Sequence, residues 1–378
     1  MNLVEIKDFG FSYPESSRKV LEHVNLNIKE GTLNVIMGRS GCGKSTLLRQ
    51  LKSVLAPAGE KEGEILYRNI PLRDTDHRTQ SQEIGFVMQN PDNQIVTDKV
   101  WHELAFGLES LGYDNATIRL RVAEMASYFG IQKWFYKNVS ELSGGQKQLL
   151  NLASVMAMHP SLLILDEPTS QLDPIAASDF LETVKKINRD IGTTVLLTEH
   201  RLQDIIPYAD QVFVMDEGTL FMEGTPREIG TKLKEQHHGM FLSMPVPMQI
   251  YAGTESTLTC PLTVSEGRQW IREYIEEKGI KKEQIQQANQ RLERQGEKNK
   301  NETAGLFGHF KRQKENTPPA IQMKDVWFRY EKDSPDVIQD LSLEVKKGEF
   351  YALVGGNGTG KSTTLSLLGR VHQPYSGR

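Results

Sequence analysis

Hydrophobic and polar residues alternate through much of the first thirty positions, and longer apolar runs follow. The alternation over residues 3–6, 9–13 and 24–28 predicts antiparallel strands that each turn one face to a core. Near-continuous apolar runs at 33–37, 84–88, 162–168 and 193–198 predict strands of a parallel sheet that are buried on both faces. Residues 211–215 and 218–223 predict a hairpin that completes this sheet.

Stretches with helical character lie between these strands, at 47–51, 100–106, 116–129, 141–158 and 176–190. Strands that alternate with helices are typical of an α/β fold, in which helices flank a mainly parallel sheet. Ligands bind to such sheets at the carboxyl ends of the strands. We therefore look for chemistry at the residues that directly follow each apolar run.

A glycine-rich loop joins the run at 33–37 to the helix that follows. It fits the pattern G-x-x-x-x-G-K-[ST] and consists of Gly38, Arg39, Ser40, Gly41, Cys42, Gly43, Lys44, Ser45 and Thr46. Such a loop turns backbone N–H groups toward a polyphosphate, and the helix that opens at Lys44 adds its positive dipole end. Lys44 is expected to reach the β- and γ-phosphates and Ser45 to contact Mg²⁺. The chain is therefore predicted to bind a nucleoside triphosphate.

The same pattern recurs near the end of the sequence, again after an apolar run, at 350–354. Its residues are Gly355, Gly356, Asn357, Gly358, Thr359, Gly360, Lys361, Ser362 and Thr363. Lys44 and Lys361 are 317 positions apart (361 − 44), and so are Tyr13 and Tyr330 (330 − 13). Tyr330 and this loop predict a second nucleotide site, with Ser362 at its Mg²⁺. By the same offset Arg378 corresponds to position 61 of the first copy (378 − 317).

Two carboxylates, Asp166 and Glu167, end the run that begins at residue 162. At the ligand edge of the sheet Asp166 is suited to hold Mg²⁺ through water, and Glu167 to polarise the attacking water. The run at 193–198 delivers His200 to the same edge, where we expect it to contact the γ-phosphate. These three residues are the predicted chemistry of the first site.

Two further motifs allow two interpretations each from the residues alone. Leu142, Ser143, Gly144, Gly145 and Gln146 open a helix, where they form either an anion site or a serine cap with a loose first turn. Tyr13 either stacks on an adenine ring or packs within the sheet.

The order of these motifs resembles the nucleotide-binding domain of ABC transporter ATPases over residues 1–235. Leu-Ser-Gly-Gly-Gln between the phosphate loop and the Asp-Glu strand is the signature of that family. The resemblance implies a P-loop fold of the ABC type, with an antiparallel β subdomain and a helical subdomain that carries the signature. It also implies that ATP lies between the phosphate loop of one domain and residues 142–146 of another.

Residue roles follow from the resemblance. Tyr13 becomes the residue that stacks on adenine, Gln89 the Q-loop residue that touches Mg²⁺ and the attacking water, Glu167 the catalytic base and His200 the switch histidine. In-line attack by water is then helped chiefly by positioning and electrostatics.

Residues 89–94 and 103–107 are similar to the energy-coupling-factor subgroup of importers, in which the helix after the Q-loop docks a membrane component. This similarity implies a peripheral subunit on the cytoplasmic face of the cell membrane. Its implied partners are a transmembrane coupling subunit, a membrane substrate-capture subunit and a second ABC ATPase domain from the same or another chain. The implied cargo is a vitamin, a vitamin precursor or a transition-metal ion.

Composition excludes several other classes. A formal charge of −4 over 378 residues gives no electrostatic case for nucleic acid, and no nucleic-acid partner is expected. No apolar run approaches the roughly 18 residues of a membrane span, and the N-terminus lacks a signal-peptide pattern. The only cysteines, Cys42 and Cys260, make no disulfide framework and fit a reducing cytoplasm. Beside Lys44 and a helix start, the thiol of Cys42 either has a lowered pKa or only fills a variable position.

The sequence changes character after residue 235. Residues 236–280 are predicted to form an accessory region with an amphipathic helix at 265–278, and residues 281–319 a charged polar linker. Residues 320–378 are an incomplete second ATPase domain that contains only its phosphate loop. We expect the chain to be part of a longer two-domain ATPase. We also expect it to bind ATP but to turn over poorly unless the first domains of two chains pair.

Two other functions remain open at this point. A soluble tandem ABC ATPase that acts on ribosomes or nucleic acid also has two fused domains, but the basic helical arm or coiled coil usual there is not visible. A nucleotide-binding scaffold without hydrolysis is disfavoured because Glu167 and His200 are both present.

Overall fold

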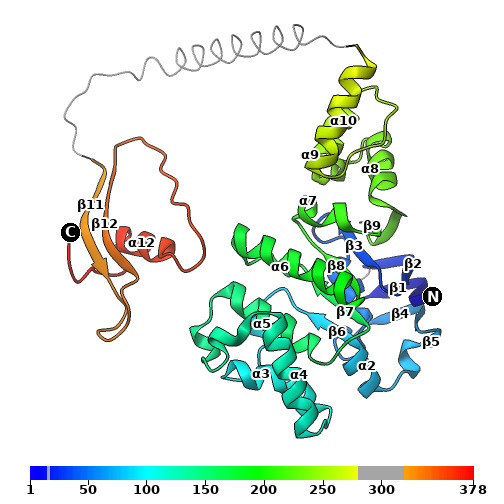
Figure 1. The fold of residues 1–378 in the computed structure, drawn as a ribbon, viewed down its shortest axis with the longest axis horizontal. Helices are drawn as coiled ribbons and strands as arrows, with labels where there is room; N and C mark the ends of the chain where they lie inside the picture. The colour runs from blue at the N-terminus through cyan, green and yellow to red at the C-terminus, as the bar shows by residue number, and fades with distance from the viewer. Residues whose placement is uncertain (15–17, 280–318) are drawn as a thin grey trace. The chain divides into compact units, whose positions relative to one another are not determined.

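The chain divides into two units, Met1–Trp270 and Ile271–Arg378. The computed structural model describes residues 1–14, 18–279 and 319–378 (Figure 1). The predicted linker lies outside the described residues, except for its last position.

A six-stranded sheet in the order β10-β9-β3-β8-β7-β6 forms the centre of the first unit. Its strands are β3 (Leu33–Gly38), β6 (Ile84–Val87), β7 (Leu162–Asp166), β8 (Thr194–Thr198), β9 (Gln211–Asp216) and β10 (Thr219–Gly224). All neighbours run parallel except β9 and β10, which pair antiparallel as a hairpin. The α/β fold with a mainly parallel sheet is thus confirmed.

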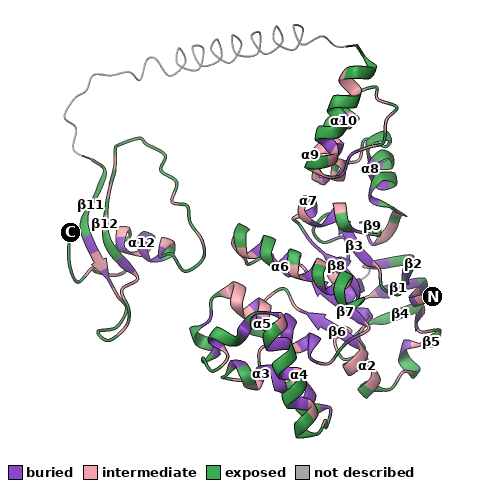
Figure 2. Cartoon of the chain, viewed as in Figure 1, coloured by how far each residue is buried: buried purple, intermediate pink, exposed green. Residues whose placement is uncertain are grey.

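Both faces of this sheet are covered. In β7 the side chains of Leu163 and Leu165 belong to one buried cluster, while Leu162 and Ile164 belong to another. Figure 2 shows these central strands as buried. Since alternate residues enter different cores, every position must be apolar, which explains the continuous runs in the sequence.

A second sheet, β2-β1-β4-β5, is antiparallel, as predicted. Its strands are β1 (Asn2–Ser12), β2 (Leu21–Lys29), β4 (Glu60–Tyr67) and β5 (Ile70–Pro71). The two predicted strands at 3–6 and 9–13 are one strand, interrupted by a bulge at Asp8, whose φ is +48°. The extra residue lets Ile6 and Phe9 both turn inward, so the alternation changes phase there.

Helices cover these sheets. The α-helices of the first unit are α1 (Lys44–Gln50), α2 (His77–Glu83), α3 (Val100–Ser110), α4 (Asn115–Tyr128), α5 (Gly144–Met156), α6 (Pro174–Lys186), α7 (Leu202–Ile205), α8 (Pro226–Glu235), α9 (Val246–Ala252) and α10 (Val264–Glu277), which runs across the boundary between the units. Shorter turns include η1 (Leu72–Asp74), η2 (Pro91–Asn93), η3 (Ile131–Trp134), η4 (Val139–Glu141), η6 (Ile206–Tyr208) and η7 (Gly239–Ser243), and η5 (Ile187–Ile191) is a π-helical turn.

Several helices start where a side chain caps them. Asp114 accepts hydrogen bonds from the backbone N–H groups of Ala116 and Thr117 and so starts α4, and Asp173 starts α6 in the same way. Helices α3, α4 and α5 pack together as the helical subdomain (Figure 1). In α10, Trp270 is buried but Ile271 is 41% exposed, so the predicted apolar side is only partly covered.

The second unit contains β11 (Ile321–Phe328), β12 (Ile338–Val345) and α12 (Lys361–Leu368). The apolar run at 350–354 forms no strand, and Phe350 and Val354 are 98% and 87% exposed. The backbone groups of Lys324 and Arg378 form hydrogen bonds with each other. The equivalent pair in the first copy is Lys7 of β1 with Glu64 of β4. Arg378 therefore corresponds to position 64 and not to position 61, because the second copy has fewer residues before this strand. In the part of the chain that the structure describes, we find no helix long and apolar enough to cross a bilayer.

Candidate nucleotide site

The first phosphate loop connects β3 to α1, and its backbone carbonyl groups hold the side chain of Lys44. The Lys44 ammonium donates to the carbonyl oxygens of Gly38 and Arg39, at 2.9 and 3.0 Å. An ammonium has three N–H donors, so one is left for a phosphate oxygen. Gly38 has to be glycine, because a Cβ there would lie 2.3 Å from the carbonyl oxygen of Met215.

Asp166 lies directly beside this loop, at the end of β7. It accepts hydrogen bonds from the Ser45 hydroxyl at 2.8 Å and from the Thr198 hydroxyl at 3.1 Å. Burial raises the pKa of the Asp166 carboxyl, and these two hydroxyls counter part of the rise. Sequence reasoning missed Thr198, although the parallel register pairs it with Asp166 and a strand-end hydroxyl next to a carboxylate was a usable signal.

The three predicted catalytic side chains meet at the same edge. The Glu167 carboxylate accepts a hydrogen bond from the Gln89 amide at 3.1 Å, and its other oxygen lies 3.0 Å from Nε2 of His200. They follow three neighbouring strands, β6, β7 and β8. Glu167 has a φ of +46°, a left-handed conformation that is costly for a non-glycine residue and is frequent at functional sites.

Glu199, a buried residue that was not assigned from the sequence, holds His200 in position. Glu199 accepts hydrogen bonds from the backbone N–H groups of His200, at 2.6 Å, and of Arg201, at 3.2 Å. Its other oxygen accepts from the Thr169 hydroxyl. The signal was a charged residue that directly follows a fully buried strand, since such a residue needs partners.

The residues at this edge fit Mg²⁺. Ser45, Asp166 and Gln89 supply hydroxyl, carboxylate and amide oxygens, the hard ligands that Mg²⁺ prefers. Among the described residues no group of three or more His, Cys, Asp or Glu side chains forms a metal site. Proteins hold Mg²⁺ through one or two carboxylates together with substrate phosphates.

The signature residues 142–146 open α5 with a capping box. The Ser143 hydroxyl accepts from the Gln146 N–H at 3.3 Å, and the Gln146 side-chain oxygen accepts from the Ser143 N–H at 3.0 Å. A Cβ on Gly144 would meet nothing within 4 Å, so this helix start faces open space. The serine cap is therefore present, and the surface over it is free.

Helix α5 is also tied to the Q-loop. The Gln148 and Asn151 amides donate to the carbonyl oxygens of Met88 and Pro91, at 3.0 and 3.2 Å. Lys147 forms an ion pair with Asp92 at 2.6 Å. These contacts join the segment around Gln89 directly to the signature helix.

Tyr13 and Cys42 complete the first loop. The Tyr13 hydroxyl is 3.2 Å from that of Thr46, and its ring meets Phe11 edge-on but is 39% exposed. Adenine stacking on Tyr13 stays a prediction. Burial raises the pKa of the Cys42 thiol and outweighs the opposing effect of Lys44, so of the two interpretations the lowered pKa is excluded.

The second loop repeats the local geometry of the first. Lys361 donates to the carbonyl oxygens of Gly355 and Gly356, at 2.8 and 2.5 Å, and the Tyr330 hydroxyl is 3.0 Å from that of Thr363. Ser362 is exposed, and within residues 319–378 no counterpart of Asp166 or Glu167 faces it.

Comparison with known proteins agrees with this geometry. The sequence profile of the ABC transporter family matches residues 21–170 and 338–378. A Bacillus anthracis protein, provisionally named an ABC transporter ATP-binding protein, is 35% identical over 99% of this chain and 63% of its own length. A Bacillus subtilis protein, provisionally named the HMP/thiamine import ATP-binding protein YkoD, is 29% identical over 100% of this chain and 63% of its own length. The chain thus spans less than two thirds of these curated relatives.

Solved structures give the same family. CbiO1 from Clostridium perfringens, described as part of the ABC transporter complex CbiONQ, has a TM-score of 0.55 and 32% identity over 64% of this chain and 95% of its own. The ATP-binding cassette MJ0796, described as a dimer in a post-hydrolysis state bound to ADP and Pi, has a TM-score of 0.52 and 26% identity over 59% of this chain and 98% of its own. With its phosphate loop, Asp-Glu strand and signature helix in these positions, the chain belongs to the ABC transporter family and has the fold of its ATPase domain.

Proposed function

We propose that the first unit binds ATP with Mg²⁺ and hydrolyses it to power a membrane importer. The observation that carries the proposal is the meeting of Gln89, Glu167 and His200 beside the Ser45–Asp166 pair. A base, a histidine and an amide at one strand edge, next to a phosphate loop, are the parts that phosphoryl transfer to water needs.

Each residue has a distinct task in this proposal. Glu167 accepts the proton of the attacking water, while Gln89 and His200 fix the two oxygens of its carboxylate. Lys44 and the backbone N–H groups of the loop hold the phosphate oxygens in line with that water. Ser45 and Asp166 would hold Mg²⁺, which supplies charge neutralisation at the β- and γ-phosphates.

A second ATPase domain is proposed to complete the site. The signature helix of the first unit begins at an exposed surface with free space over Gly144, and helix starts bind anions. The relative MJ0796 is described as a dimer with ADP and Pi. We infer that residues 142–146 cover the γ-phosphate held by the phosphate loop of a partner domain, from the same or another chain.

Transport is the proposed use of this ATP. Val96, Trp101 and Phe106 are exposed on the loop and helix that follow the Q-loop, where an apolar membrane partner would dock. The description of CbiO1 as part of a transporter complex, and the import function in the name of YkoD, favour the energy-coupling-factor type. The chain would then lie on the cytoplasmic face of the membrane with a coupling subunit and a substrate-capture subunit, for a vitamin, vitamin precursor or metal ion.

Glu167→Gln tests the hydrolytic role. ATP affinity is expected to stay within about threefold of wild type, while turnover falls by about 10²–10⁴-fold because the base is lost. Glu182→Gln is the matched control, since Glu182 pairs with Lys185 on the surface of α6, and it should leave both quantities unchanged. Wild-type turnover by Glu167→Gln would contradict the assignment. Co-purification of the full protein with ribosomes in place of membrane proteins would contradict the transport proposal.

A further inference from the structure

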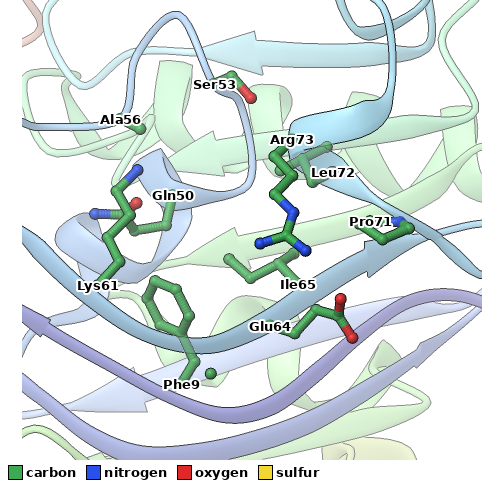
Figure 3. A pocket seen from close by; sticks show the side chains of 11 residues that line it. Phe9, Gln50, Ser53, Ala56, Lys61, Glu64, Ile65, Pro71, Leu72 and Arg73 are labelled. Carbon is green, nitrogen blue, oxygen red and sulfur yellow. The ribbon is translucent and has the colours of Figure 1, made fainter.

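A pocket of about 210 Å³ lies between the antiparallel sheet and the end of α1, apart from the nucleotide residues described above (Figure 3). Its apolar part includes Phe9 from β1 and Leu72 from η1, and its polar part includes Gln50, Lys61 and Arg73. These residues come from four different elements. The pocket is therefore created by tertiary packing and not by one loop.

Two irregularities of the sheet lie beside this space. Between Lys7 and Gly10 the strand β1 carries one more residue than its partner β4. The bulge sits opposite Gly63, whose φ is +72° and where a Cβ would lie 2.2 Å from the carbonyl oxygen of Asp8. Only glycine fits there. Bulges are frequent beside functional sites because they redirect side chains.

Gln50 is the residue that points to a ligand. It is 3% exposed, it lines the pocket, and its amide nitrogen is buried without a hydrogen-bond partner among the described residues. Neighbouring polar groups already use other partners: the Ser53 N–H donates to Gln80, and Lys52 donates to the carbonyl oxygen of Ile84. Buried donors are almost always paired. This nitrogen has almost no exposed surface, so the Gln50 amide has to turn before it donates to an acceptor that enters the pocket.

The charges around the pocket favour an anion. Lys61 has no ion pair among the described residues, and Arg73 has only Asp74, at 3.9 Å on an exposed surface. Figure 3 shows the guanidinium of Arg73 over Ile65, with Gln50 and Lys61 on one side of it and the carboxylate of Glu64, which also lines the pocket, on the other. Two cations and an amide donor suit an oxyanion, and the apolar lining suits a short hydrocarbon group.

We propose that this pocket is an effector site for a small organic carboxylate, whose oxygens meet the Gln50 amide, Lys61 and Arg73. Drug-sized ligands need about 300–1,000 Å³, so an occupant of this smaller pocket is a metabolite with few carbon atoms. Gln50 and Thr46 lie one turn apart on α1, the helix that also carries Lys44 and Ser45. Occupancy would fix the last turn of that helix, and this link to ATP rests on the proposed function.

Saturation-transfer NMR on the purified full chain tests the site without nucleotide. The observed probes are isovalerate and its neutral analogue isovaleramide, and inorganic phosphate, which has no carbon-bound proton to observe, is added as a competitor. Transfer to isovalerate is expected, at least fivefold weaker to the amide and little reduced by an equal concentration of phosphate. Equal transfer to isovaleramide, loss of the transfer in an equal concentration of phosphate, or none to isovalerate would overturn the proposal.

Variants locate the binding. Gln50→Leu keeps the size of the side chain and removes the unpaired amide, so it is expected to melt at or above the wild-type temperature and to lose at least four fifths of the transfer. The surface double variant Lys61→Met/Arg73→Met should lose it as well, which keeps the test decisive if Gln50→Leu fails to fold. Lys29→Met, on the neighbouring strand β2, is a control that removes one positive charge outside the pocket, and it should retain the transfer. Undiminished transfer in both pocket variants would place the ligand elsewhere.

A second readout tests the effector role. Saturating isovalerate is expected to change the Kd for ATP at least fivefold in wild type and not in Gln50→Leu. An unchanged Kd would overturn regulation. A chain that bound no ATP would instead contradict the proposed function, and it would leave the binding of isovalerate measurable on its own.

Discussion

The two phosphate-loop segments share their loop but not the strand before it. Gly41 and Gly358 have φ values of +80° and +79°, and Lys44 and Lys361 each donate to the first two carbonyl groups of their loops. The preceding residues differ sharply: Leu33 and Met37 are 1% and 0% exposed, while Phe350 and Val354 are 98% and 87% exposed. The same kind of apolar run is thus a buried strand in one copy and exposed chain in the other.

Partners explain this difference. In the first unit β3 lies between β8 and β9, which follow it by more than 150 residues and pair with it in parallel register. Within residues 319–378 no such strands are present beside the run at 350–354. The loop is set by glycine positions and its own hydrogen bonds, so it forms without the sheet. A parallel strand is non-local, and it forms only where its neighbours exist.

Hydrogen exchange should show the largest contrast between the copies. Amides of β3 are expected to exchange at least about 10³-fold more slowly than those of residues 350–354, because a central strand opens only with the whole unit. The measurement is exchange followed by mass spectrometry on peptides that cover the two segments. Comparable protection of both segments would mean that the second run finds a strand partner that the structure does not show.

The lysines of the two phosphate loops are expected to differ in their effect on ATP turnover. Lys44→Ala is expected to lower ATP turnover at least about 100-fold, since in the proposed function its ammonium contacts the phosphates as charge develops. Lys361→Ala should change turnover less than about twofold, because no base faces that loop within the described residues. Steady-state phosphate release measures both. Equal losses would show that the second loop takes part in the hydrolytic site.

Lys52 is expected to make the stability of the first copy depend on pH in a way that the second copy does not share. Burial lowers the pKa of Lys52 from 10.5 to about 8, and its counterpart 317 positions later is Gly369. Between these pKa values the unfolded chain keeps the Lys52 proton and the folded unit does not, so the fold gains stability as pH rises through this window. The gain is up to about 3 kcal/mol.

Denaturant titrations at pH 8 and pH 10.5 measure this gain as the difference between wild type and Lys52→Met. The variant lacks the group and should lack that part of the pH dependence. Identical pH dependence of the unfolding free energy in the two proteins would refute the assignment to Lys52.

The sequence predicted what is locally encoded. The phosphate loops and the cap at Ser143 were recognisable because each depends on neighbouring residues. The runs of the central sheet were recognisable because burial on both faces requires continuous apolar sequence, although the run at 350–354 shows that such a run becomes a strand only beside its partners. β4 was not predicted: its sequence, Glu-Lys-Glu-Gly-Glu-Ile-Leu-Tyr, is charged over the half that faces solvent and apolar only at the end. It is a strand because β1 pairs with it.

The residues of the candidate site also divide into those that the local sequence indicates and those that depend on tertiary contacts. Asp166, Glu167 and His200 were predicted from their places after buried runs, and the structure brings the last two together with Gln89. Thr198 and Glu199 were not assigned, since their roles depend on the register of β7 against β8 and on which backbone groups lie nearby. Tertiary proximity of this kind leaves no periodic pattern in a sequence.

We propose that a nucleotide site on one unit needs the signature of another domain. The rate of ATP hydrolysis per chain, measured as a function of chain concentration with the state of association followed by sedimentation, tests this requirement. The rate per chain is expected to be very low for monomers and to rise as first units pair. A rate per chain that stays constant and substantial at concentrations where every chain is monomeric would show that no second signature is needed.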